Sequence, residues 1–420
     1  SERVLFRPLW MTYFSPHATS NDAESVKPVT TGVPYVTPLK ELCIQEVARN
    51  FSERPHFGKL QALHVKRIID LLALDLPLEL VGVLIDDEAY WKRRSCSRWK
   101  NLEVMAHGNS WKQLYFERNA EEALETFDPE DGDVQTLRRL LTFSRRFARN
   151  LTVSQLPSHL DLQILFDTTA SCLTSLTLTY GMKSVGMDYD RSLFGMKLSD
   201  CRSLAKALER TETLTYLNLS SNLLDDDKMR MVASGMVDNL SVTALDLSHN
   251  KIADRGVRAL AKLLDSRSVI AHLNLCDNQV HTEGARALAR ALRANVSLIE
   301  LNLRLNRIGD EGGRAICDVL RGNSTLQRVN LSSNALAEAA ATSLGHLLRV
   351  NTSLIEVDLS SNQFTPEAGR VIRDALEENT AVRSMDVRMC GVGADIELLV
   401  AEAVRRNQAA SSDMGHVGVF

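Results

Sequence analysis

The sequence predicts an α/β solenoid, in which short parallel strands line one face and helices cover the other, and three observations predict it. An asparagine recurs at a constant interval along the chain, each time after a short alternating apolar stretch such as "LNLRLN". An aliphatic residue stands eight positions before each of these asparagines, and an amphipathic helical pattern such as "EGARALARALRAN" fills the rest of the period. The recurring positions are Asn222, Asn250, Asn278, Asn306, Asn334 and Asn362, with Cys390 one period later.

The recurring asparagine is typical of a 28-residue leucine-rich repeat of the ribonuclease-inhibitor-like kind. Each repeat turns a corner after its strand and leaves interior backbone groups without a ladder partner. An asparagine side chain carries both donors and an acceptor, so we predict that it satisfies backbone groups of its own repeat and of the next. Cysteine fits the same small slot as a weaker hydrogen-bonding partner. These residues are therefore predicted to be structural anchors rather than catalytic groups.

A second asparagine column closes the repeats, and its members keep the same interval as the anchors. We predict that each of them caps a helix in the left-handed conformation, which asparagine tolerates better than most residues. The members are Asn295, Asn323, Asn351, Asn379 and Asn407.

The two element types predict a curved stack. Parallel strands lie about 4.8 Å apart whereas packed helices need about 10 Å, so the strands must lie on the inside of the curve. Only neighbouring repeats touch in such a solenoid, and its concave surface is typically used for binding.

Strand alternation places polar side chains on the concave surface, where we predict protein-binding residues. Two interpretations stay open. The charged members form a patch that recognises a partner, or Glu300, Arg328 and Glu356 neutralise one another on successive strands. His272 and Cys276 lie roughly 13 Å apart at strand rise, too far for one metal ion. The candidate protein-binding residues are Tyr216, His272, Glu300, Arg304, Arg328, Glu356 and Arg388.

Composition narrows the class of protein. The chain has 420 residues and a net charge of −4, which gives no electrostatic case for nucleic acid or an anionic membrane. No apolar run approaches the roughly 20 residues that span a bilayer. Seven cysteines without a C-x-x-C pair indicate a reducing, intracellular compartment, and the start at Ser1 suggests further residues upstream. Without a P-loop lysine motif, H-E-x-x-H or G-x-S-x-G, we predict no enzyme, cofactor, metal or small-molecule substrate.

The part before the regular repeats divides by composition. Residues 1–38 form a proline-rich arm that we predict to be extended and to dock through "VLFRPLWMTYF", which contains Phe6, Trp10 and Phe14. We predict that residues 39–150 form a helical cap domain, in which "LPLEL" and "CSRW" are similar to the ends of an F-box. The alternative is a compact cap with Trp91, Trp99 and Trp111 in its core. Further regions are an irregular first repeat with an insertion (151–212), regular repeats (213–407) and a tail (408–420).

Four stretches carry a resemblance to a known family. They are "LPLELVGVLIDDEAYWKRR", "SWKQLYFERN", "LTYGMKSVGMDYDRSLFGMKLSDCRSLAKAL" and "LIELNLRLNRIGDEGG". Together, from about Leu76 to Asn407, the sequence resembles the dynein regulatory complex subunit 5 family, that of the T-complex-associated testis-expressed protein.

This resemblance implies a non-enzymatic scaffold and regulatory subunit of the nexin–dynein regulatory complex, in the cytoskeleton of ciliary and flagellar axonemes. It implies binding to other subunits of that complex, including a second leucine-rich-repeat subunit, in an assembly that links doublet microtubules and regulates dynein-driven motility. Two other classes remain open. One is an F-box leucine-rich-repeat substrate receptor of a ubiquitin ligase, and the other is a GTPase activator.

Overall fold

The computed structural model describes residues 37–169, 171–181, 190 and 193–415, and it divides into two compact units at the Leu72–Ala73 bond. The first unit holds helices α1 (Leu39–Arg49) and α2 (Ala62–Leu71), which pack against each other. Arg67 and Glu41 join the two helices by an ion pair of 2.7 Å. Phe6, Trp10 and Phe14 of the predicted arm lie outside the described residues.

The second unit begins with helices that surround an aromatic core. They are α3 (Leu78–Leu84), α4 (Glu88–Arg98), the 3-10 helix η1 (Val104–His107), α5 (Trp111–Glu125) and α6 (Val134–Ser144). Trp91 is fully buried and packs against Tyr115 and Phe116, with ring centroids 5.3 and 5.5 Å away. Trp99 and Trp111 are only half-buried, so of the three tryptophans considered as core, Trp91 is the buried one.

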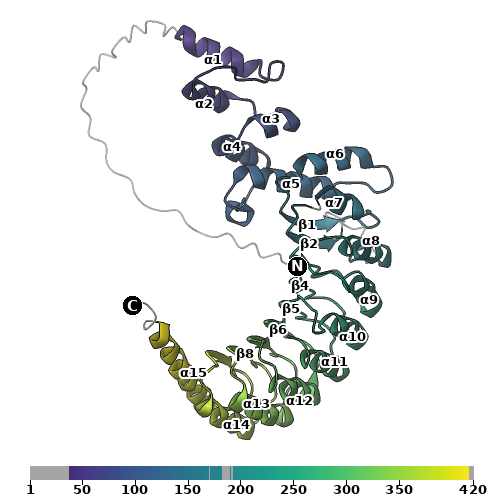
Figure 1. The fold of residues 1–420 in the computed structure, drawn as a ribbon, viewed down its shortest axis with the longest axis vertical. Helices are drawn as coiled ribbons and strands as arrows, with labels where there is room; N and C mark the ends of the chain where they lie inside the picture. The colour runs from purple at the N-terminus through teal and green to yellow at the C-terminus, as the bar shows by residue number, and fades with distance from the viewer. Residues whose placement is uncertain (1–36, 170, 182–189, 191–192, 416–420) are drawn as a thin grey trace, which may run out of the picture. The chain divides into compact units, whose positions relative to one another are not determined.

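The rest of the second unit is a parallel solenoid (Figure 1). In the described residues, nine strands form one sheet in chain order, and all eight pairings are parallel. The strands are β1 (Asn150–Leu156), β2 (Ser175–Tyr180), β3 (Tyr216–Asn218), β4 (Ala244–Asp246), β5 (His272–Asn274), β6 (Glu300–Asn302), β7 (Arg328–Asn330), β8 (Glu356–Asp358) and β9 (Ser384–Asp386). The predicted leucine-rich-repeat architecture is confirmed.

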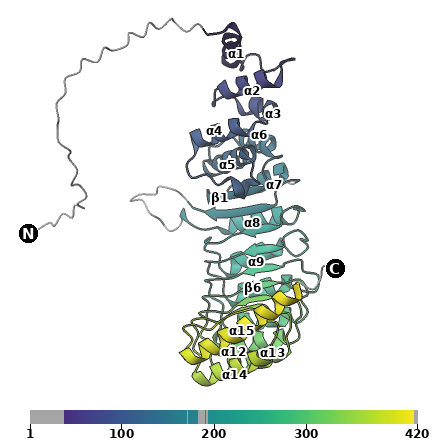
Figure 2. The ribbon, with the colours of Figure 1, turned by 90° about the vertical axis from the view of Figure 1, so that its left-hand side faces the viewer.

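Helices cover the outer side of this sheet, while the strands lie on its concave side, which faces the viewer in Figure 2. The helices are α7 (Gln163–Thr169), α8 (Leu198–Leu208), α9 (Asp226–Ser234), α10 (Asp254–Leu263), α11 (Thr282–Leu292), α12 (Gly309–Leu320), α13 (Glu338–Val350), α14 (Pro366–Glu378) and α15 (Ala394–Gly415). One continuous apolar core runs between the two layers. Among the described helices, none combines the length and the apolar character that crossing a membrane requires.

The anchor asparagines are buried and satisfy backbone groups, as predicted. The Asn306 amide nitrogen donates to the carbonyls of Leu275 (2.8 Å) and Leu303 (2.9 Å), and its oxygen accepts from the Val280 N–H (3.0 Å). Leu275 and Val280 belong to the preceding repeat, so the prediction of a partner in the next repeat is wrong. Because the side chain bonds to the repeat before it, every anchor connects its own turn to the turn of the preceding repeat. Cys390 keeps one of these contacts, with its thiol 2.9 Å from the Leu359 carbonyl.

The left-handed conformation occurs in a different column from the one predicted. Asn351 and Asn379 are extended, with φ −84° and −82°, and neither they nor the other members of their column have positive φ. Their amides instead cap the preceding helix from the side, as where Asn351 donates to the Leu320 carbonyl at 2.9 Å. A residue with positive φ instead stands one position before each anchor: Ser221, His249, Asp277, Leu305, Ser333, Ser361 and Met389. The sharp corner lies there because the chain must reverse before the anchor turns inward.

Helix α5 covers the outer edge of β1, a strand that the sequence does not predict. Glu117, Glu121 and Glu125 lie at successive i, i+4 positions on one helical face. Glu117 accepts from the Asn150 N–H (2.7 Å), Glu121 from that of Thr152 (2.6 Å) and Glu125 from that of Ser154 (2.9 Å). These alternate N–H groups point to the side of β1 that has no neighbouring strand, so a row of carboxylates satisfies the edge of the sheet.

Cysteine reactivity tests this burial pattern. Cys43 and Cys96 are exposed, whereas burial raises the pKa of the Cys201 and Cys317 thiols to about 12. Because the thiolate is the nucleophile, Cys201 and Cys317 should alkylate at least about a thousandfold more slowly at pH 8 than an ordinary thiol. We expect iodoacetamide followed by peptide mass spectrometry to label Cys43 and Cys96 first. Equal labelling rates for all four in the folded chain would contradict the core described here.

Candidate protein-binding surface

Five of the predicted binding residues form one row across the concave surface. Tyr216, His272, Glu300, Arg328 and Glu356 each begin a strand, and the strand register aligns them side by side, with Ala244 between Tyr216 and His272. Arg304 and Arg388 lie in a second row, two residues after β6 and β9, and are separated by serines in the two intervening repeats. The structure therefore brings all seven predicted residues onto one face, in two parallel rows.

Part of the first row is internally neutralised. The Glu300 carboxylate accepts from Arg328 Nε (3.1 Å) and Nη2 (3.0 Å), and it lies 3.2 Å from His272 Nδ1. Glu356 follows Arg328 on the next strand, yet its exposed carboxylate has no hydrogen bond or ion pair within the described part of the chain. The exposed guanidinium of Arg304 is likewise without a partner there. Among the seven predicted residues on this face, Glu356 and Arg304 are thus the two charged side chains that remain available for an ion pair with another molecule.

A third row, between the other two, is held rigidly. Asn274 donates to the Asp246 carboxylate (3.0 Å), and Asn330 donates to that of Asp358 (2.8 Å), in each case from a neighbouring strand. The same side chains accept the N–H two residues further on, as Asp358 does from Ser360 at 3.0 Å. Arg388 bonds to Asp386 and holds the pKa of that carboxyl below its usual range. The hydrogen bonds therefore preorganise the side chains of this third row.

Two hollows interrupt this floor. Because Ala244 is small, a space of about 200 Å³ opens between Tyr216 and His272. A second space of about 320 Å³ lies over β6 to β9 and is flanked by Arg328 and Glu356. The first volume is below the about 300–1,000 Å³ of typical ligand pockets and the second is at its lower limit, so both are of a size for single side chains.

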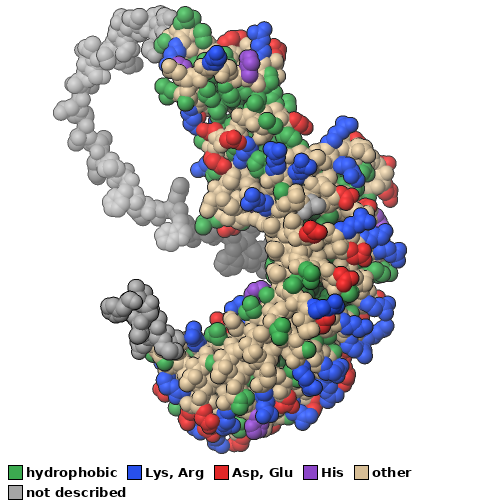
Figure 3. Space-filling model, in the orientation of Figure 1, with side chains coloured by type: hydrophobic (Ala, Val, Ile, Leu, Met, Phe, Trp, Pro, Cys, Tyr) green, Lys and Arg blue, Asp and Glu red, His purple; other side chains and the backbone are tan. Residues whose placement is uncertain are grey.

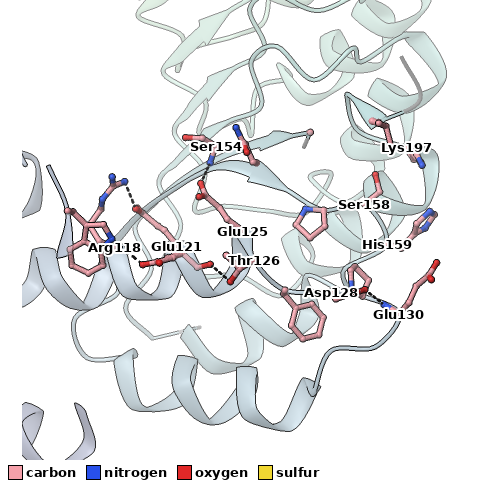
Figure 4. Close-up of a pocket in the computed structure, with 18 residues that line it drawn as sticks. Arg118, Glu121, Glu125, Thr126, Asp128, Glu130, Ser154, Ser158, His159 and Lys197 are labelled. Carbon is pink, nitrogen blue, oxygen red and sulfur yellow. Dashed lines mark hydrogen bonds and ion pairs between the residues drawn. The ribbon is translucent and has the colours of Figure 1, made fainter. Parts of the chain in front are cut away.

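A larger cavity lies beside the edge strand β1 (Figure 4). Its volume is about 1050 Å³, and the carboxylates of Glu121, Glu122 and Glu125 along it already have structural partners. Glu121 is bound by Arg118 at 3.0 Å and Glu125 by the Ser154 N–H, as the dashed lines in Figure 4 mark. Burial raises the pKa of Glu121 above its ordinary value. The arrangement of these carboxylates stabilises the edge of the sheet.

Histidine and cysteine side chains do not form a metal centre in the part of the chain that the structure describes. No group of three or more His, Cys, Asp or Glu residues in that part has the geometry to hold a metal ion. His249 Nδ1 lies 2.8 Å from Asp277, but both side chains are about half exposed, and both residues occupy the left-handed corner positions. This pair belongs to the rim of the repeats.

A double-mutant cycle on Glu300 and Arg328 tests the first row. We expect a coupling free energy of about 0.5 kcal/mol, because exposed ion pairs contribute about 0.2–1 kcal/mol and are screened by salt. Urea unfolding of the chain with Glu300→Gln, Arg328→Gln and both changes measures it. A coupling above about 2 kcal/mol would show that the pair is a structural element rather than a surface contact.

Comparison with known proteins agrees with the repeat geometry. A family model described as Leucine Rich repeat matches residues 238–261, 270–289, 294–317 and 350–372. Among solved structures, the tropomodulin C-terminal domain of Caenorhabditis elegans is 17% identical, covers 33% of this chain and 99% of its own, and has a TM-score of 0.25. Leiomodin-1 actin-binding site 2 is 15% identical over 52% of this chain and 92% of its own, with a TM-score of 0.26. At these scores neither structure informs function.

Curated relatives share one name. The chain is 65% identical over 196 residues to "Dynein regulatory complex subunit 5" of Chlamydomonas reinhardtii, which covers 47% of this chain and 50% of that protein. It is 37% identical to the proteins of that name from Mus musculus, over 229 residues, and Homo sapiens, over 228, with 48% of this chain and 46% of each relative covered. The chain thus spans about half the length of the curated relatives it matches. The resemblance is confirmed: this is a leucine-rich-repeat protein homologous, over about half its length, to dynein regulatory complex subunit 5.

Proposed function

We propose that the chain is a non-enzymatic scaffold and regulatory subunit of the nexin–dynein regulatory complex in ciliary and flagellar axonemes. The observation that carries this proposal is the 65% identity over 196 residues to a Chlamydomonas reinhardtii protein named as a subunit of the dynein regulatory complex. In this role the chain binds other subunits, including a second leucine-rich-repeat subunit, and helps to link doublet microtubules and to regulate dynein-driven motility.

The concave surface is the part of the molecule that we propose to meet a partner subunit. Its third row is locked by hydrogen bonds between neighbouring strands, so little side-chain entropy is lost when a partner docks. Its two hollows accept protruding side chains of the partner. One hollow lies beside Tyr216 and His272, and the other lies beside Arg328 and Glu356. Glu356 and Arg304 supply charges of opposite sign that select the orientation of the partner.

Quantitative mass spectrometry of axonemes tests the assignment to the complex. Axonemes are isolated from matched cells that contain or lack the nexin–dynein regulatory complex, and peptides of this chain are counted against tubulin. We expect at least about a tenfold depletion where the complex is absent, because a subunit without its assembly loses its binding site. Unchanged abundance would overturn the assignment. Stoichiometric recovery of a ubiquitin-ligase adaptor with the chain would support the F-box interpretation of residues 76–99 instead.

A charge exchange tests the concave surface itself. The chain carrying Glu356→Arg and Arg304→Glu keeps its net charge and changes two exposed side chains that have no partner among the described residues. We expect it to capture at least about tenfold less of the other complex subunits from axonemal extract, since two interfacial charge contacts become repulsive. The matched control exchanges Glu367→Arg and Arg370→Glu on α14, whose ion pair of 3.2 Å survives the exchange. Equal capture by both variants would place the interface elsewhere.

A further inference from the structure

The outer surface of α10, α11 and α12 gathers positive charge, although the whole chain carries −4. Positions one repeat apart lie side by side on adjacent helices, as Arg258, Arg286 and Arg314 do, and α10 contacts α11, which contacts α12. Figure 3 shows lysine and arginine side chains along the outer edge over these helices. We name this surface the convex basic face. Its members are Arg255, Arg258, Lys262, Arg286, Arg290, Arg293, Arg314 and Arg321.

Two acidic residues of the same helices are engaged with backbone groups. Asp254 accepts from the N–H groups of His281 (2.8 Å) and Gly284 (2.9 Å), at the start of the next helix. Asp310 does the same for α13, accepting from Ala337 and Ala340 at 2.9 and 2.8 Å. A carboxylate at a helix N-terminus compensates the positive end of the helix dipole, so these two charges do not neutralise the arginines.

Two further carboxylates neutralise only part of the face. Glu283 pairs with Arg286 at 2.8 Å, and Glu311 pairs with Arg314 at 2.9 Å. Of the helices described, α10 to α12 therefore keep six exposed cations that have no ion-pair partner among the described residues. They are Arg255, Arg258, Lys262, Arg290, Arg293 and Arg321. Exposed Asp318, which also has no such partner, opposes them.

We propose that the convex basic face binds an acidic polypeptide segment, independently of the concave surface. Three helices packed about 10 Å apart make the face about 20 Å wide, and Arg286 to Arg293 spans about 10 Å along α11. An extended chain advances about 3.3 Å per residue, so six or seven residues cross the face. A run of glutamates or aspartates of that length places carboxylates beside Lys262, Arg290 and Arg293, the cations nearest its centre.

The observations favour a polypeptide over nucleic acid. Glu283, Glu311 and Asp318 lie among the cations and repel a rigid row of closely spaced phosphates, whereas a flexible peptide can avoid them. Helices α10, α11 and α12 contain no aromatic residue on which a base could stack. The face also lacks the long continuous charge that a duplex requires, since neighbouring α13 carries few cations.

Fluorescence anisotropy with a fluorescein-labelled octaglutamate peptide tests the proposal on the full chain. We expect binding that weakens at least about fivefold between 50 and 200 mM salt, because exposed charges are screened over about 8 Å. The chain with Lys262→Glu, Arg290→Glu and Arg293→Glu should bind at least about tenfold more weakly. Circular dichroism confirms that the exposed changes leave the fold intact.

The control variant carries the same change in net charge at scattered exposed arginines: Arg54→Glu, Arg139→Glu and Arg405→Glu. It should bind octaglutamate within about twofold of the unmodified chain, since none of these lies on the convex basic face. Equal weakening in both variants would mean that only net charge matters, and the proposal would fail. It would also fail if octaglutamate did not bind, or if a duplex of 12 base pairs bound more tightly than the peptide.

Discussion

Replacing Asn306 by alanine is expected to lower the free energy of unfolding by about 3–5 kcal/mol. The side chain is buried and is hydrogen-bonded to three backbone groups at 2.8–3.0 Å, in two repeats. Truncation leaves the Val280 N–H without its acceptor in a closed interior, which costs about 1–3 kcal/mol. It also removes the hydrogen bonds to the Leu275 and Leu303 carbonyls, about 1 kcal/mol each, although these carbonyls still accept from Asn278 and Asn334. Urea unfolding followed by circular dichroism measures the change.

Two matched variants separate the anchor from ordinary asparagines. Asn302→Ala removes a half-buried side chain of the same type, four residues away, whose oxygen accepts only from the Arg304 N–H at 3.0 Å. It should cost no more than about 1 kcal/mol. Asn306→Cys should cost less than Asn306→Ala, because Cys390 occupies the equivalent slot and keeps a carbonyl contact. Similar losses for Asn302→Ala and Asn306→Ala would show that the anchor has no special structural role.

Replacing Glu117 by alanine is expected to cost about 3 kcal/mol and to loosen the N-terminal edge of the sheet. The carboxylate is fully buried, accepts from the N–H groups of Arg149 (2.8 Å) and Asn150 (2.7 Å), and is bound by Gln113 and His107. Its loss opens a strand edge to water and leaves these donors unpaired. Hydrogen exchange of the Glu117→Ala variant, compared with the unmodified chain, should be accelerated more in β1 than in β6.

Glu117→Gln and Glu125→Ala provide the comparison. The glutamine oxygen can still accept the strand N–H groups, so Glu117→Gln should keep at least half of the lost stability. Glu125 is half-buried whereas Glu117 is fully buried, so Glu125→Ala should cost about 1 kcal/mol or less. If Glu117→Ala and Glu125→Ala were equally mild, the edge of the sheet would not depend on the carboxylate row.

The periodic features could be predicted from the sequence because they repeat. Each anchor stands in the same environment, so six asparagines and one cysteine report on a single structural requirement. The same periodicity placed Tyr216, His272 and Glu356 on one surface, since strand alternation is local. The pairing of Glu300 with both Arg328 and His272 follows from register alone. Whether that surface binds a partner stays a prediction.

The sequence predicts the left-handed residues in the wrong column for a physical reason. Asparagine is among the residues that most readily adopt positive φ, so its second column is the natural place to expect this conformation. The corner instead contains residues as different as Ser221 and Leu305. Their N–H groups donate to the Ser248 and Ser332 carbonyls of the next repeat, which fixes the backbone whatever the side chain. Asn239 also belongs to the second column by its position in the repeat, and it donates to the Leu208 carbonyl at 2.8 Å. The sequence pattern does not show this, because Arg267 stands where the asparagine between Asn239 and Asn295 would be.

The sequence contains the spacing of the carboxylate row on α5, but the periodicity of the repeats does not predict what the row contacts. Glu117, Glu121 and Glu125 follow the i, i+4 spacing of one helical face, yet that pattern is usually a solvated face. Only the position of β1, which follows α5 in the chain after the whole of α6, shows what the face covers. Long-range contacts of this kind do not appear in local sequence patterns.

Carbodiimide labelling of carboxylates tests the central claim that this repeat protein functions by binding a partner on its concave surface. Glu356 is exposed and unpartnered among the described residues, so it should label readily in the isolated chain. We propose that a partner subunit covers the surface in intact axonemes, so the labelling of Glu356 there should fall at least about fivefold, while chain released by mild denaturation regains it. Labelling of Glu356 that is the same in the isolated chain and in axonemes would contradict the account.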